Sequence, residues 1–132
     1  MNEREIFNTV IVVIGSFFTY IFGIWDTCLI VLVAFMSLDY ITGLIAAIIQ
    51  DKLNSHIGFK GILRKSTILL VLIVAVLLDR LLSNGTWVFR TIVAYFYIGN
   101  EGISILENVG KCGVPLPKKM IKALEQLRKK EE

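Results

Sequence analysis

Four long apolar stretches occupy most of this chain of 132 residues. They cover residues 6–24, 27–49, 63–82 and 87–109, and the first contains no charged residue. Because a helix needs about 20 apolar residues to cross a bilayer, we expect each stretch to form a transmembrane helix. Hydrophobic residues make up 55% of the sequence and charged residues only 19%. A soluble domain of this size could not bury so much apolar surface.

The predicted fold is an all-α membrane protein. The continuous apolar runs favour helices, since the strands of a membrane barrel alternate between apolar and polar residues. We expect residues 1–110 to form a bundle of four transmembrane helices and residues 111–132 to form a basic cytoplasmic tail. Residues 118–130 of this tail predict a short amphipathic helix, whose apolar face carries Met120, Ile121, Leu124 and Leu127.

Basic residues predict the orientation in the membrane. With four crossings, twelve of the fourteen Lys and Arg residues lie on one side, and the positive-inside rule makes that side cytoplasmic. Both termini are then cytoplasmic. A three-crossing chain that lacks the first crossing keeps the same bias and stays as the alternative. The cytoplasmic basic residues include Lys60, Arg64, Lys65, Lys118 and Lys119.

Asp39 lies in the middle of the second stretch, where a carboxylate facing lipid is costly. Gly43 and Ala47 follow it on the same helical face, and small residues at this spacing allow helices to approach closely. Two interpretations remain open. Asp39 either makes a structural hydrogen bond within the bundle or acts in pore lining and assembly.

Further polar residues interrupt the other stretches. Asn100, Glu101 and Ser104 give the fourth stretch a polar face that favours water or a partner helix. Asp79 and Arg90 lie at matched depths, roughly 6–8 Å below a turn expected at residues 83–85. We expect these two side chains to form an intramembrane ion pair. A stripe of small residues in the first stretch predicts helix packing, and it consists of Gly15, Thr19 and Gly23.

No set of residues predicts catalysis, a metal site or a cofactor. His56 is the single histidine and has no cysteine near it in the sequence. Cys28 and Cys112 fall on opposite sides of the membrane in the expected topology and so cannot form a disulfide. The basic tail lacks interleaved aromatic residues, so we expect it to attract anionic lipid and not nucleic acid.

Four segments together resemble the toxin-secretion/phage-lysis holin family, over residues 25–125 approximately. They are residues 39–43 (DYITG), 55–65 (SHIGFKGILRK), 100–108 (NEGISILEN) and 113–117 (GVPLP). The resemblance implies a small protein of the bacterial inner membrane that forms homo-oligomeric lesions. Such lesions let an endolysin reach the cell wall, and some relatives export a toxin instead. Holins of one three-crossing class have the N-terminus outside, which differs from the four-crossing topology expected here.

Two other classes of function also fit the residues. One is a small ion channel or transporter that uses Asp39 as an intramembrane carboxylate. The other is an adaptor that docks a partner through the basic tail. A holin is expected to pass folded proteins, a channel only ions, and an adaptor nothing.

Overall fold

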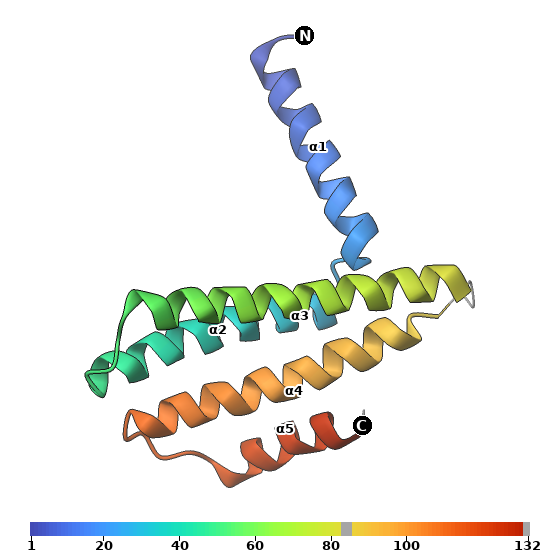
Figure 1. Ribbon diagram of the computed structural model, residues 1–132. Helices are drawn as coiled ribbons and strands as arrows, with labels where there is room; N and C mark the ends of the chain where they lie inside the picture. The colour runs from blue at the N-terminus through green and yellow to red at the C-terminus, as the bar shows by residue number, and fades with distance from the viewer. Residues whose placement is uncertain (83–85, 131–132) are drawn as a thin grey trace.

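The computed structural model describes residues 1–82 and 86–130, which form five helices and no strand. The helices are α1 (Glu3–Phe22), α2 (Thr27–Ile49), α3 (Ser55–Leu82), α4 (Val88–Lys111) and α5 (Lys118–Lys130) (Figure 1). The all-helical prediction is confirmed. Three helices, α1, α2 and α3, are long and apolar enough to cross a membrane. The turn expected at residues 83–85 lies outside the described residues.

Side-chain caps set two of the helix starts. Asp26 accepts a hydrogen bond of 3.0 Å from the backbone N–H of Leu29 and thereby begins α2. Asn54 accepts one of 2.8 Å from the backbone N–H of Ile57. Because of this second cap, α3 begins at Ser55 and not at residue 63, where the predicted transmembrane helix started.

The helices α2, α3 and α4 lie side by side, and α5 lies along α4, whereas α1 points away from them (Figure 1). The main contact of α1 is with α3. The expected bundle of four membrane helices is not confirmed. The first helix stands outside the group formed by α2, α3 and α4, and α4 is not among the three described helices that are apolar enough to cross a membrane. The helix α5 of the predicted tail packs on α4.

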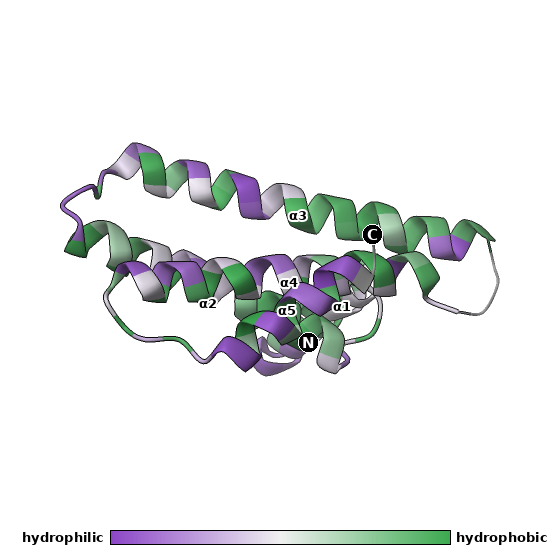
Figure 2. Cartoon of the chain, turned by 90° about the horizontal axis from the view of Figure 1, so that it is seen from below, coloured by the Kyte–Doolittle hydropathy of each residue, from purple (hydrophilic) through white to green (hydrophobic). Residues whose placement is uncertain are grey.

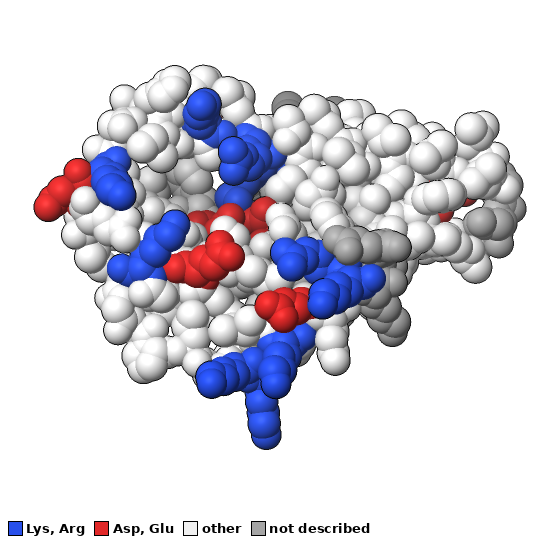
Figure 3. Space-filling model, turned by 60° about the horizontal axis from the view of Figure 1, so that its bottom comes forward, with Lys and Arg blue, Asp and Glu red and all other residues white. Residues whose placement is uncertain are grey.

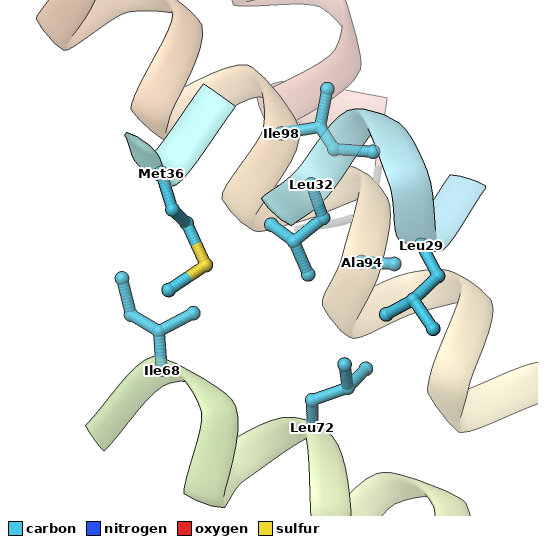
Figure 4. Packing of buried hydrophobic residues seen from close by; sticks show 7 residues of the cluster. All are labelled: Leu29, Leu32, Met36, Ile68, Leu72, Ala94 and Ile98. Atoms are coloured by element: carbon cyan, nitrogen blue, oxygen red, sulfur yellow. The ribbon is translucent and has the colours of Figure 1, made fainter. Parts of the chain in front are cut away.

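Seven apolar residues form a hydrophobic cluster between α2, α3 and α4. Leu32 of α2 and Leu72 of α3 are completely buried, and Met36 points toward Ile68 across the seam between these helices (Figure 4). Cores of this kind are held together by close van der Waals contact, which also acts between helices in lipid. The cluster consists of Leu29, Leu32, Met36, Ile68, Leu72, Ala94 and Ile98.

The outside of the molecule is apolar on one part and charged on another. Large apolar side chains on α1, α2 and α3 are exposed, and the C-terminal half of α3 is almost uniformly hydrophobic (Figure 2). Charged side chains gather on part of the face that includes α5, while another part of that face carries very few (Figure 3). The apolar surface is suited to lipid, and the charged face requires water or lipid headgroups.

Candidate functional site: a charged cluster inside the bundle

Three charged side chains from three helices meet inside the bundle. The Nζ atom of Lys65 on α3 lies 2.6 Å from Oδ2 of Asp39 on α2 and 2.7 Å from Oε2 of Glu101 on α4. The exposed fractions of these side chains are 16% for Lys65, 13% for Asp39 and 5% for Glu101. Buried charges persist only when they are paired, and here one ammonium group pairs with two carboxylates. We refer to these three residues as the charged cluster.

The cluster forms because its members lie at one height. Asp39 and Glu101 each lie ten residues before the end of their helices, and Lys65 lies ten residues after the start of α3. At 1.5 Å per residue, each is about 15 Å from the end of the bundle that carries the loop at residues 50–54. Lys65, which was predicted from the sequence to be one of the cytoplasmic basic residues, thus lies within α3 and is directed into the bundle.

A second layer of hydrogen bonds orients Asp39. The Nδ2 group of Asn108 donates to Oδ1 of Asp39 over 2.9 Å and to Oγ1 of Thr42 over 3.0 Å. The Thr42 hydroxyl in turn donates to the carbonyl of Leu38 over 2.7 Å. From the sequence, Asn108 was included only in the segment of residues 100–108, and neither the partner of Asn108 nor the role of Thr42 was predicted. Among the described residues, every buried side-chain nitrogen and oxygen has a hydrogen-bond partner.

The stripe of small residues on α2 faces α4 of the same chain. A Cβ atom added at Gly43 would lie 3.6 Å from Nδ2 of Asn108, an ordinary van der Waals distance, so this position lies directly against the Asn108 amide. Gly43 and Ala47 also line a pocket of about 210 Å³, and Asp39, Lys65 and Ser104 line the same pocket. The expected neighbours of Asp39 are thus brought together within one subunit.

The charged cluster places one positive and two negative groups in contact. With all three groups ionised, the charged cluster carries one net negative charge. The charged residues that line the pocket beside it are Asp39, Arg64 and Lys65. In the described part of the chain, no group of three His, Cys, Asp or Glu side chains has the geometry to hold a metal ion.

Asp79 and Arg90 are adjacent, but they do not form the expected ion pair. The Asp79 carboxylate accepts hydrogen bonds from the backbone N–H groups of Phe89 and Arg90, over 2.9 and 2.8 Å. These N–H groups belong to the first turn of α4 and have no partner within that helix. Asp79 therefore acts as an N-cap supplied by α3, since Trp87 at the capping position offers no side-chain hydrogen bond.

The guanidinium group of Arg90 is directed at the turn between α1 and α2. It donates to the carbonyls of Phe22 and Ile24, each over 2.8 Å, and lies 3.0 Å from Oδ2 of Asp26. The hydrogen bond from Arg90 holds the pKa of the Asp26 carboxyl below its usual value. Gly23 in this turn has φ 83°, and a Cβ there would lie 2.7 Å from Nε of Arg90, so only glycine suits the position.

The remaining predicted residues lie apart from the charged cluster. Gly15 has no neighbour that a Cβ would meet, and the hydroxyl of Thr19 donates to the Gly15 carbonyl within α1. Gly23 is engaged by Arg90, whereas Gly15 and Thr19 line an open pocket together with Arg80 of α3. Several predicted residues are exposed and make no contact within the charged cluster, namely Lys60, Asn100, Lys118 and Lys119. Arg64 is exposed as well, but it lines the pocket that Asp39 and Lys65 also line.

Comparison with known proteins gives one family over most of the chain. The family model described as the bacteriophage holin family matches residues 16–129. A 14.9 kDa protein of the nagH 3′ region of Clostridium perfringens is 58% identical over 91% of each chain. A protein described as a probable holin of Bacillus phage phi105 is 42% identical over 61% of this chain and 58% of its own length. No solved structure matches the chain.

Proposed function

The chain belongs to the bacteriophage holin family, and from this we propose that it is itself a holin of the bacterial cytoplasmic membrane. In this proposal, copies of the chain assemble into homo-oligomeric pores or lesions. These release an endolysin that lyses the host, or they export a toxin. The protein has no enzymatic activity of its own, needs no cofactor, and interacts with membrane lipids.

The observation that carries the proposal is the charged cluster inside an otherwise apolar molecule. Three ionisable groups about 15 Å from one end of the bundle are costly in lipid. Pairing lowers this cost while the chain is a single subunit, so copies can accumulate without opening the membrane. If assembly turns the faces around Asp39 and Glu101 toward water, the same charges become favourable, because water solvates them in a pore.

The seam where the bundle opens is the one between α2 and α3 in this proposal. Apolar side chains there leave a groove of about 400 Å³, in which Lys65 lies beside Met36 and Tyr40. The seam between α2 and α4 is instead tied by Asn108 and by the packing around Gly43. Rotation of α3 would break the contacts of Lys65 with less loss of packing than separation of α2 from α4.

We also propose four membrane crossings with both termini in the cytoplasm. The helix α4 runs along α2 and shares the charged cluster with it, so a membrane that contains one would contain the other. With Lys65 inside the bundle, eleven of the fourteen basic residues still belong to the N-terminal segment, to residues 50–64 or to residues 111–130. Cysteine labelling at position 119 in a cysteine-free variant tests this. Labelling from outside intact cells would contradict the topology.

Expression in bacteria tests the function. We expect an abrupt loss of membrane potential, followed by lysis only when an endolysin is co-expressed. Asp39→Leu at equal membrane levels should change the time of this loss, because it removes one partner of Lys65. Lys60→Met, which alters an exposed lysine, is the matched control. Normal timing in Asp39→Leu would exclude a role of the charged cluster in triggering.

A small ion channel is the second candidate function. The pocket beside Asp39, Lys65 and Ser104 favours it, because polar groups inside a membrane bundle mark ion pathways. Size-selective leakage from vesicles separates the two functions. Release of a folded protein supports a holin, whereas release of ions with retention of the protein supports a channel. An adaptor that docks a partner through the basic tail would release neither.

A further inference from the structure

The tail helix α5 is held in a notch on α4. A Cβ atom added at Gly102 would lie 2.7 and 3.0 Å from the two δ-carbons of Leu124. A Cβ at Gly99 would lie 2.9 Å from the carbonyl oxygen of Leu124 and 3.0 Å from the backbone nitrogen of Arg128. The two glycines thus form a surface into which Leu124 fits, and the backbones of the two helices come into contact. We refer to Gly99 and Gly102 as the notch.

The docked helix carries its charges deep along the bundle. Gly99 lies twelve residues before the end of α4, which corresponds to about 18 Å. Because Arg128 contacts Gly99, the last turn of α5 reaches the height of the charged cluster. Lys122 and Lys129 are exposed on this helix. The basic residues of α5 are Lys118, Lys119, Lys122, Arg128, Lys129 and Lys130, against the single acidic Glu125.

This position conflicts with a bundle surrounded by lipid. Residues of α2 and α3, both long and apolar enough to cross a membrane, share the charged cluster with α4. A membrane around these helices would place Arg128 and Lys129 far from its surface, where basic side chains are strongly disfavoured. The docked position is stable only while water reaches this side of α4. Headgroups at the cytoplasmic surface offer an alternative site for the basic face, since anionic lipids attract clustered Lys and Arg.

We propose that α5 is a detachable latch that exchanges between the notch on α4 and anionic lipid headgroups. In a zwitterionic membrane no lipid charge competes for the basic residues of α5, and Leu124 stays in the notch as long as water reaches this side of α4. At an anionic membrane surface the basic residues of α5 bind phosphate headgroups, and the helix leaves α4. Release exposes a small-residue face, of the kind on which helices in lipid pack closely. The exchange of α5 takes place within one subunit in contact with lipid, so it can be tested whether or not the protein forms pores.

A disulfide across the notch tests the latch. Gly102→Cys with Leu124→Cys, in a chain with Cys28→Ser and Cys112→Ser, places two thiols where a δ-carbon now meets the notch. We expect the disulfide to form readily in phosphatidylcholine vesicles. Its yield should fall at least threefold in vesicles that contain phosphatidylglycerol. Equal yields in both lipids, or no disulfide in phosphatidylcholine, would overturn the proposal.

A second measurement leaves the notch unchanged. Spin labels at positions 100 and 126, both exposed, report the distance between α4 and α5 with the native glycines and Leu124 in place. This distance should increase when phosphatidylglycerol is added. Lys122→Gln with Lys129→Gln should suppress the increase, whereas Lys52→Gln with Lys60→Gln, a matched change outside α5, should not. An unchanged distance in anionic vesicles would exclude the latch.

Discussion

The ammonium group of Lys65 lies 2.7 Å from the carboxylate of Glu101, although 36 residues separate them in the chain. The same ammonium group contacts Asp39, so one lysine joins α2, α3 and α4. Removal of one partner from a buried ion pair leaves an uncompensated charge, which costs more than the pair itself contributes. The charged cluster is therefore the place where single substitutions should have the largest effects.

Lys65→Met should strongly destabilise the bundle. It leaves two buried carboxylates facing each other, and the loss of a partner from a buried pair costs about 3–5 kcal/mol. Lys65→Arg keeps the positive charge and should lose less. Unfolding in mixed detergent, followed by circular dichroism, measures the difference. A Lys65→Met protein as stable as the Lys60→Met control would show that the charged cluster contributes nothing to the fold.

Neutralising both carboxylates should cost more than the sum of the single changes. Asp39→Asn and Glu101→Gln each leave Lys65 with one charged partner, whereas the double variant leaves its ammonium group buried and unpaired. Coupled residues deviate from additivity by about 0.5–3 kcal/mol. A double-mutant cycle on the free energy of unfolding in detergent measures the coupling. Additive effects would mean that the two carboxylates act independently of Lys65.

Asp79→Ala should weaken the start of α4, because two backbone N–H groups lose their acceptor. The loss of an N-cap costs about 1 kcal/mol, and Asp79→Asn, which keeps an acceptor oxygen, should lose less. The combined exchange Asp79→Arg with Arg90→Asp should not restore stability. Unfolding in detergent measures the stability of each variant. If the double exchange is more stable than both single variants, a direct ion pair between these side chains is supported instead.

The turn between α1 and α2 should loosen in acid. The Arg90 hydrogen bond lowers the pKa of Asp26 below the usual value of 3.8. The contact therefore stabilises the turn above that value, and the stabilisation is lost as the pH falls through the lowered pKa of the folded state. As the pH falls below the usual pKa of Asp26, the distribution of distances between spin labels at positions 13 and 74 should broaden. Asp26→Asn should show the broader distribution at neutral pH and a smaller change on acidification.

Local properties of the sequence determined the helices and much of the site. The prediction of a membrane helix needs only the hydropathy and the length of a segment, so it does not depend on the rest of the fold. Helical spacing also placed Asp39 with Gly43 and Ala47, and Glu101 with Ser104, because residues three or four apart share a face. The family was likewise evident from short segments, and the match over residues 16–129 confirms it.

Only the tertiary structure decided which polar groups meet. Helices as uniformly apolar as α2 and α3 have no distinct face that fixes their rotation, so the contact of Lys65 with Asp39 depends on packing among three helices. Asp79 and Asp26 lie at similar depth, so either carboxylate could pair with the Arg90 guanidinium. The pair with Asp26 forms because the turn around Gly23 also offers Arg90 two backbone carbonyls. The notch at Gly99 and Gly102 became apparent only with α5 in place. Spacing along one helix is local, whereas partners 36 or 64 residues apart are set by how whole helices pack.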